Sequence, residues 1–199
     1  MESDPRSFFT LYYYRELFNE LPPVKEVVKL LSHLHRCSES PDGRFGFPVD
    51  TYRERVRSRT SRRSDKWETF FTDLLEDTMR QDQEIHGADG ELIELEKDVL
   101  LRVVPRLLRP METGGREVKP VLLHGNLWHG NMATDEAYSD IPAVFFDPSC
   151  FYGHNEYDLA FWRAGRYKTN LIFRQEYVRE MGESAPGKDF DDRNALYAV

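Results

Sequence analysis

The chain is poor in cysteine, and it has neither a long apolar run nor an excess of basic residues. Its two cysteines, Cys37 and Cys150, lie far apart without a CxxC or CxxH grouping, so neither a disulfide framework nor a structural zinc site is indicated. No segment reaches the roughly 18 uninterrupted apolar residues of a membrane-spanning helix, and the start MESDPRSFF lacks the order of a secretory signal. The net charge of −8 argues against general affinity for nucleic acid or anionic membrane. The sequence therefore predicts a cytoplasmic protein with neither of these partners.

Internal repeats and low-complexity tracts are also lacking, so the 199 residues are expected to form a single domain. Hydrophobic residues make up 40% of the chain and aromatic residues 13%, which suffices for a packed core. Helical periodicity predicts a first helix from Pro23 to about His35, a second that begins at Trp67, and a third that carries Leu92 to Leu107 with a kink at Pro105. The segment SESPDGRFGF predicts an ordered loop with aromatic anchors.

A basic run separates this loop from the second helix. It contains seven basic residues, Arg53, Arg55, Arg57, Arg59, Arg62, Arg63 and Lys66. We interpret it as a solvated mobile loop. The alternative is a docking patch for phosphate or an acidic partner, because arginine forks bind such groups bidentately.

The second half changes to short β-rich runs. Val121 to Leu123 and Ala143 to Phe146 read as two buried strands that flank a polar loop, and a largely buried helix is predicted over Tyr157 to Trp162. The predicted fold class is α+β and mostly helical, with helices packed around a small hairpin-like element.

Two polar segments follow these strands, LLHGNLWHGN at 122–131 and VFFDPSCFYGHNEYDLAFW at 144–162. Phosphoryl transfer calls for a carboxylate base, a nearby amide oxygen and a metal-binding carboxylate. Asn126, Asn131 and Asp147 stand at spacings that suit these three positions. An alternative is a transition-metal site made of His124, His129, His154 and Asp147.

These segments resemble the fructosamine kinase family, also called ketosamine 3-kinases or protein-ribulosamine 3-kinases. That family has an HGDLWxGN loop and an FDPAxxYGHxExDLA segment, where this chain reads HGNLWHGN and FDPSCFYGHNEYDLA. The resemblance extends upstream through LHR, SPDGRFGF, WETFF and VVPRLLRP and covers most of residues 30–165. It implies the carboxyl-terminal lobe of a protein-kinase-like, aminoglycoside-phosphotransferase-like fold, and ATP and Mg²⁺ as cofactors.

The resemblance also implies roles for individual residues. Asn131 and Asp147 would hold Mg²⁺ and the phosphates, and His124 and Asp158 would support the catalytic loop. Weaker expectations of substrate contact fall on Trp128, Tyr152, His154 and Glu156, although core packing is favoured for Trp128, and the other three could instead hold the loop.

The chain departs from the family pattern at Asn126, where the family has its catalytic aspartate. The resemblance further implies that residues 1–22 form a hinge-like segment, with Phe9 to Leu17 near the adenine, and that residues 23–199 form the helical lobe with its catalytic hairpin. The amino-terminal β lobe is expected to be absent. The predicted function is phosphorylation of the 3-hydroxyl of ketosamines on glycated proteins or small molecules. The alternatives are a non-catalytic pseudokinase or interaction module, and a related small-molecule phosphotransferase.

Overall fold

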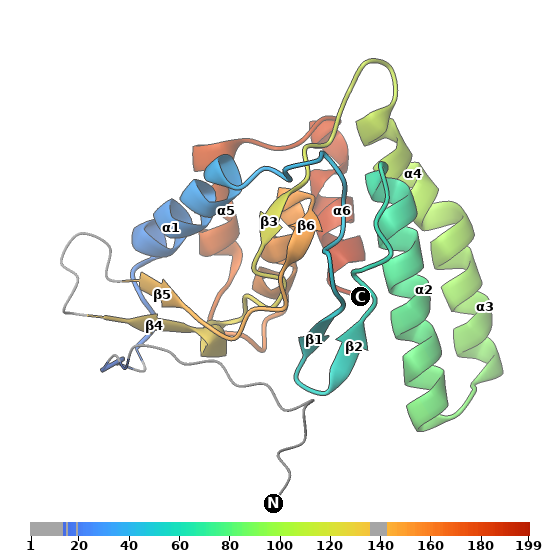
Figure 1. Cartoon of the computed structure of the whole chain (residues 1–199), viewed down its shortest axis with the longest axis horizontal. Coiled ribbons are helices and arrows are strands. Elements are labelled where there is room, and N and C mark those ends of the chain that lie inside the picture. Colours follow the sequence, from blue (N-terminus) through green and yellow to red (C-terminus); the bar gives the residue numbers. More distant parts are fainter. Residues whose placement is uncertain (1–13, 15, 19, 136–142) are drawn as a thin grey trace, which may run out of the picture.

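The computed structural model describes residues 14, 16–18, 20–135 and 143–199 of an α+β fold in which helices predominate (Figure 1). Most of the predicted hinge segment at residues 1–22, including Phe9, therefore lies outside the described residues. The helices are α1 (Val24–Cys37), α2 (Trp67–His86), α3 (Gly90–Asp98), α4 (Val104–Leu108), α5 (Leu171–Met181) and α6 (Phe190–Tyr197). The strands are β1 (Thr51–Arg53), β2 (Val56–Ser58), β3 (Val121–Leu123), β4 (Met132–Thr134), β5 (Ala143–Phe145) and β6 (Phe151–Gly153).

Helices α1 and α2 begin where the sequence predicted. Pro23 precedes α1, and its carbonyl accepts hydrogen bonds from the backbone N–H groups of Glu26 and Val27. Helix α1 buries Val27, Val28 and Leu31 and packs against α5. The first two N–H groups of α2 donate to the Glu112 carboxylate at 3.0 and 3.1 Å. A carboxylate stabilises a helix start because it satisfies donors that lack an intrahelical partner.

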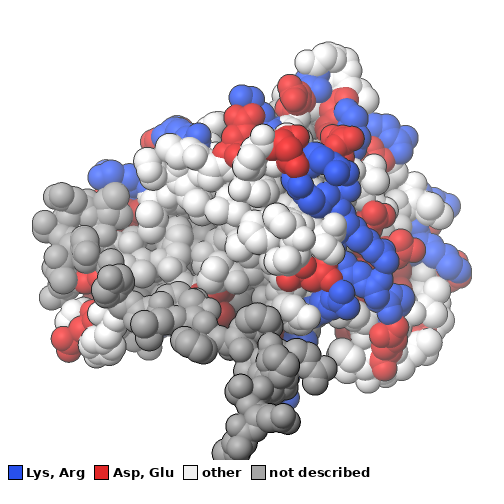
Figure 2. Space-filling view, in the orientation of Figure 1, with Lys and Arg blue, Asp and Glu red and all other residues white. Residues whose placement is uncertain are grey.

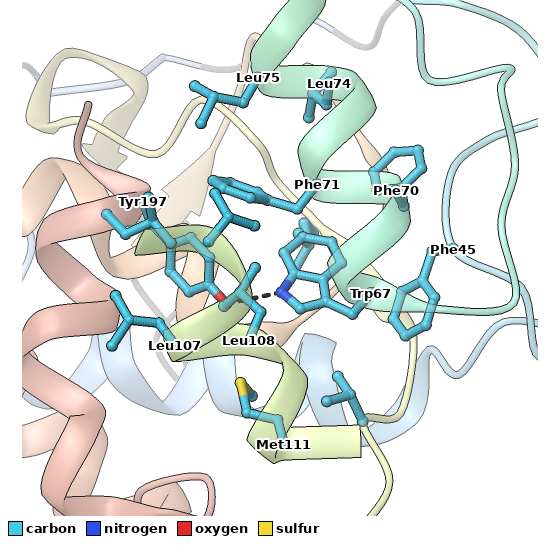
Figure 3. Packing of buried hydrophobic residues seen from close by; sticks show 14 of the residues in the cluster. Phe45, Trp67, Phe70, Phe71, Leu74, Leu75, Leu107, Leu108, Met111 and Tyr197 are labelled. Carbon is cyan, nitrogen blue, oxygen red and sulfur yellow. Dashed lines mark hydrogen bonds between the residues drawn. The ribbon is translucent and has the colours of Figure 1, made fainter. Parts of the chain in front are cut away.

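The larger of two apolar clusters surrounds Trp67 at the start of α2 (Figure 3). The indole is fully buried between Phe45, Phe70 and Phe71, and its N–H donates to the Tyr197 hydroxyl at 2.8 Å. Phe45 thus provides the aromatic anchor expected in the loop after α1. The second cluster joins α1 and α5 to Trp162 and Leu127.

The third predicted helix is interrupted. Helix α3 passes into a π-helical turn at Val99–Val103 before α4. Pro105 has no N–H to donate to the Leu101 carbonyl, which accounts for the distortion that the sequence predicted there. Leu92 and Leu95 of α3 are exposed and belong to neither apolar cluster.

The strands form three two-stranded antiparallel sheets within the described residues. Both predicted strands exist, as β3 and β5, but each pairs with a strand that the sequence did not reveal. Strand β3 pairs with β6 in the register Leu122 to Tyr152, and β5 pairs with β4 in the register Val144 to Ala133. The expected single hairpin-like element is therefore two separate ladders, between which the polar loops lie.

The basic run at residues 53–66 is largely exposed, as predicted for a solvated segment, but its first part is a β-hairpin and not a loop. Residues 51–58 form the β1–β2 hairpin, in which Tyr52 faces Arg57 across the ladder. Glu54 in the connecting turn has a φ of 55°, a left-handed conformation that glycine favours. The hairpin lies between the β3–β6 ladder and α2 (Figure 1).

The buried helix predicted over Tyr157 to Trp162 is present as a 3₁₀-helix, η4 (Asn155–Trp162), which buries Asp158, Leu159 and Trp162. None of the helices in the described ranges combines the length and apolar character needed to cross a bilayer.

Candidate functional site

Three polar side chains meet where the loops after β3 and β5 approach each other. Asn126 follows β3, Asn131 lies at the end of the same loop, and Asp147 follows β5. The Asn131 amide donates to the Asn126 carbonyl at 2.8 Å, and the Asn126 amide donates to the Asp147 carbonyl at 3.2 Å. The Asn126 amide nitrogen also lies 3.5 Å from the Asp147 carboxylate. The structure thus brings together residues that are up to 21 positions apart.

Asp147 differs from the two amides in its exposure. Asn126 and Asn131 are buried, whereas Asp147 is exposed and has a φ of 54°. A left-handed conformation is uncommon for a residue other than glycine and frequently occurs at functional sites. The carboxylate consequently faces solvent with two buried amides behind it.

The oxygen donors of this cluster suit a magnesium ion. Asn131 donates through its amide nitrogen, which leaves its amide oxygen available as a ligand beside the Asp147 carboxylate. Magnesium prefers oxygen ligands and is often held by one or two protein carboxylates together with phosphates and water. Asn131 and Asp147 therefore fit a site that is completed by a phosphate-bearing substrate.

His124 ties the two loops together. Its Nε2 donates to the Phe146 carbonyl at 3.0 Å, and its Nδ1 accepts from the Asn126 N–H at 3.3 Å. Burial lowers the pKa of His124, which favours the neutral ring that this pattern of one donor and one acceptor requires. The imidazole thus holds Asn126 at a fixed distance from the loop that carries Asp147.

Asp158 of η4 holds the backbone of the same loop. Its Oδ2 accepts from His124 N and its Oδ1 from Gly125 N, both at 2.8 Å, and Oδ2 also accepts from His35 Nε2 at 3.2 Å. Burial alone would raise the pKa of Asp158. The hydrogen bond from His35 and the neighbouring imidazoles outweigh burial, and the pKa lies below its usual value.

The sequence analysis did not identify the residues that support Asp158. His35 Nδ1 accepts from the Tyr177 hydroxyl at 2.7 Å, and the Asn155 amide donates to the same hydroxyl at 2.9 Å. His35 and Tyr177 are 142 positions apart, so no local pattern joins them. The signal that could have drawn attention to His35 was its place in the LHR motif.

Gly125 permits the two loops to approach closely. Its φ is 74°, and a Cβ atom there would lie 2.1 Å from the Ser149 carbonyl oxygen. The Ser149 N–H also donates to the His124 carbonyl at 2.9 Å. Glycine is required here both by the backbone conformation and by the available space.

His154 and Glu156 lie apart from this cluster. His154 contacts the Tyr197 hydroxyl at 2.9 Å and Ser184 Oγ at 2.8 Å, and burial lowers its pKa to about 4. Glu156 is fully buried and accepts from Arg193 Nε at 3.0 Å. These contacts join His154 and Glu156 to the carboxyl-terminal segment, a role that the sequence analysis did not foresee.

Trp128 and Tyr152 are both partly exposed. Trp128 packs on His129 and Tyr167, outside both apolar clusters, so the favoured assignment to the core is wrong. Tyr152 lies in β6, where its backbone pairs with Leu122 and bridges to Gly46.

The alternative transition-metal site is not supported. His124 lies beside the loop that carries Asp147, but His154 contacts Tyr197 and Ser184 instead, and His129 Nδ1 accepts from Lys168 N at 3.3 Å. Across the described ranges, no three or more His, Cys, Asp or Glu side chains converge in a way that could hold a metal ion.

Comparison with known proteins agrees with the resemblance in these loops. The sequence profile of the fructosamine kinase family matches residues 2–199. A probable ketoamine kinase of Enterococcus faecium is 31% identical over 136 residues, which cover 68% of this chain and 45% of that protein. The chloroplastic protein-ribulosamine 3-kinase of Arabidopsis thaliana is 27% identical over 175 residues, which cover 87% of this chain and 48% of that protein.

The mouse ketosamine-3-kinase is 42% identical over 74 residues, which cover 37% of this chain and 21% of the mouse protein. The chain thus spans about half the length, or less, of these curated relatives.

Two solved structures have a similar fold. One is a proposed fructosamine-3-kinase of Haemophilus somnus, with a TM-score of 0.66 and 19% identity over 92% of this chain and 56% of that one. The other, from Thermobifida fusca, has a TM-score of 0.68 and 20% identity over 94% of this chain and 59% of that one.

Proposed function

The chain belongs to the fructosamine kinase family, and we propose that it serves the ATP-dependent phosphorylation of the 3-hydroxyl of ketosamines carried on glycated lysines. The observation that carries the proposal is the meeting of Asn126, Asn131 and Asp147 at the ends of two loops. These residues stand at the positions that the family motifs give to the acceptor hydroxyl, the metal and the phosphates. Small ketosamines are substrates of the same chemical class.

In this proposal Asp147 and the amide oxygen of Asn131 hold Mg²⁺. ATP is the phosphoryl donor, and the metal neutralises charge on its phosphates. Asp158 and His124 act as positioning residues, because they hold the backbone of the loop that carries Asn126.

Asn126 determines how well the chain can catalyse the reaction. Its amide can orient the acceptor hydroxyl by a hydrogen bond, but an amide does not accept the proton. Loss of a general base typically lowers a rate by about 10²- to 10⁴-fold. We therefore propose a slow reaction in which the proton passes to solvent.

The proposal extends to the fold. In this proposal residues 23–199 correspond to the carboxyl-terminal, acceptor-binding lobe of a protein-kinase-like fold. The match to 56% and 59% of two full structures supports this assignment.

The second candidate is a non-catalytic member of the family that keeps the fold and binds a ketosamine or metal. Asn126 is the observation that favours it. The two candidates differ in turnover and not in the architecture of the loops.

The test is ADP formation by the purified chain with Mg²⁺, ATP and a ribulosamine-modified lysine, beside titration of the chain with Mg²⁺–ATP. Turnover is expected to disappear in Asp147→Ala and to persist in Asp98→Ala, an exposed aspartate at the end of α3. Turnover that Asp147→Ala leaves unchanged would contradict the proposed site. Binding of Mg²⁺–ATP without turnover, with turnover gained in Asn126→Asp, would establish the non-catalytic candidate.

A further inference from the structure

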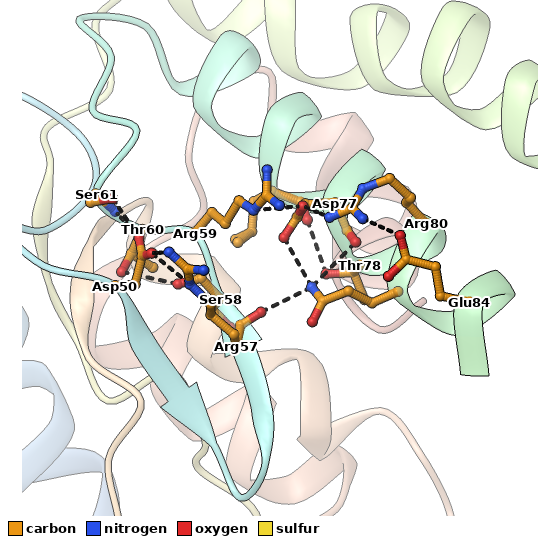
Figure 4. Close-up of polar contacts among 12 residues, drawn as sticks. Asp50, Arg57, Ser58, Arg59, Thr60, Ser61, Asp77, Thr78, Arg80 and Glu84 are labelled. Carbon is orange, nitrogen blue, oxygen red and sulfur yellow. Dashed lines mark hydrogen bonds and ion pairs between the residues drawn. The ribbon is translucent and has the colours of Figure 1, made fainter.

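Three arginines of the basic run are neutralised by carboxylates of this chain. Arg57 Nε donates to Asp50 at 2.8 Å, Arg59 pairs with Asp77 at 3.1 Å, and Arg63 donates to Asp42 at 2.6 Å. Figure 4 shows the first two pairs bridging the hairpin, the following turn and α2. These ion pairs connect the basic run to the segments that carry Asp42, Asp50 and Asp77 and so stabilise the fold.

The other four cations of the run are not neutralised in this way. Arg53, Arg55, Arg62 and Lys66 are exposed, and none of them pairs with a carboxylate among the residues that the structure places. Lys and Arg side chains form a band over the connection between α1 and α2 on the face shown in Figure 2. The run contains two acidic residues, Glu54 and Asp65. Asp65 pairs with Arg44 at 2.9 Å, and the single charge of Glu54 does not balance four cations.

The hairpin that carries part of this band contacts the candidate site. Thr51 Oγ1 lies 3.5 Å from Ser149 Oγ, and Ser149 N donates to the His124 carbonyl in the loop that carries Asn126. Arg53 lies over the ring of Phe161, 5.6 Å from its centroid, at the end of η4. A chain that presents its modified side chain to Asn126 and Asp147 would therefore pass close to the hairpin.

The same hairpin exposes apolar side chains. Tyr52 is 57% exposed, Val49 60% and Val56 43%. Exposed apolar groups among cations suit an extended polypeptide, which offers both side-chain carboxylates and apolar contacts.

We propose that the β1–β2 hairpin and the turn after it bind an acidic polypeptide segment that flanks the ketosamine-bearing lysine. This inference rests on the proposed function, because it names the kind of protein substrate that the site would accept. A phosphate site would require cations that converge on one point. Here the unpaired cations are spread over residues 53–66, with apolar side chains among them.

The test uses four fluorescent peptides, with acidic or neutral residues around one lysine and with or without a ribulosamine on that lysine. Their affinities for the full chain are measured by fluorescence anisotropy at low and high salt. Acidic flanks are expected to tighten binding at low salt, and salt is expected to remove the gain.

The informative variant is Arg55→Glu/Arg62→Glu, and the matched control is Lys25→Glu/Lys29→Glu on the exposed face of α1, which changes the net charge equally. Exposed ion pairs are individually weak, so we expect the arginine reversal to weaken acidic-peptide binding by about 5- to 20-fold and the control to retain it.

Three results would overturn the inference: equal affinity for acidic and neutral peptides, equal effects of the two double variants, or displacement of the acidic peptide by low millimolar inorganic phosphate. Failure of the proposed function gives a different result. Peptides with and without the ribulosamine would then bind with the same affinity, while the acidic unmodified peptide would still bind more tightly than the neutral unmodified peptide.

Discussion

The substitution Asn126→Asp tests whether the two candidate loops meet as described. Asn126 is 5% exposed, and its amide donates to the Asp147 carbonyl at 3.2 Å. An aspartate of the same shape has no N–H to donate, and its carboxylate would lie about as far from the Asp147 carboxylate as the amide nitrogen now does, 3.5 Å. We therefore expect the variant to be less stable than the parent at pH 7 without divalent cations.

The size of the effect follows from this distance. Two unit charges 3.5 Å apart repel by about 1 to 5 kcal/mol for effective dielectric constants of about 80 to 20. Because Asp147 is exposed, the lower end applies, about 1 to 2 kcal/mol. Loss of the hydrogen bond adds about 1 kcal/mol. The expected decrease in the free energy of unfolding is about 2 to 3 kcal/mol.

Low pH and Mg²⁺ should each reduce the deficit, that is, the loss in the free energy of unfolding of the variant relative to the parent. A neighbouring like charge raises the pKa of a carboxyl in the folded state, so the folded variant binds more protons than the unfolded chain. The repulsive part of the deficit is therefore present at pH 7 and is lost as the pH falls through the raised pKa. If the proposed site holds Mg²⁺, the ion would bind only the folded state, and it should stabilise the variant more than the parent.

The assay is urea unfolding at pH 7 and pH 5, with and without Mg²⁺. Asn170→Asp is the matched control, because Asn170 caps α5 by accepting from Ile172 N, which a carboxylate does equally well. A variant as stable as the parent at pH 7, with no added response to Mg²⁺, would refute the proximity of residues 126 and 147.

Two further predictions concern buried polar residues, Asp158 beside the candidate site and His154 apart from it. Asp158→Asn should lower the free energy of unfolding by about 2 to 4 kcal/mol, because a charged acceptor of three hydrogen bonds is lost. Asp98→Asn on the surface should change it by less than about 0.5 kcal/mol, and similar losses in the two variants would contradict the role of Asp158. His154 has a pKa of about 4 in the fold, so the unfolded chain binds one more proton between about pH 6.5 and 4, and stability falls as the pH falls through this range. When the free energy of unfolding is measured against pH, the slope between about pH 6.5 and 4 should decrease by the equivalent of about one proton in His154→Gln. An unchanged slope would show that His154 is protonated in the folded chain.

The sequence predicted the parts of this fold that are determined by residues close together along the chain. The starts of α1 and α2 and the strands β3 and β5 carry local signals in their prolines, helical spacing and β-branched residues. Strands β4 and β6 carry much weaker signals. Strand β4 is Met132-Ala133-Thr134, which contains no valine or isoleucine, and β6 is Phe151-Tyr152-Gly153, which ends in a glycine that favours a turn.

The same distinction applies to the candidate site. Asn126, Asn131 and Asp147 could be selected from the motifs, but their distances depend on how two ladders pack. The contact of Tyr177 with His35 depends on α5 lying against α1, which no periodicity specifies. The basic hairpin was missed because Arg57 within it and Arg59 just after it pair with Asp50 and Asp77, which lie outside the run.

The way Asp158 holds the loop has a consequence for how this protein evolves. Its carboxylate accepts from the backbone of His124 and Gly125 and makes no contact with the side chain at position 126. The hydrogen bonds of Asp158 can therefore form with either asparagine or aspartate at position 126, although the Asn126 side chain also donates to the Asp147 carbonyl. Asparagine and aspartate codons differ by a single nucleotide, so a lineage could exchange the two at this position and alter its chemistry while the surrounding architecture stays under separate selection.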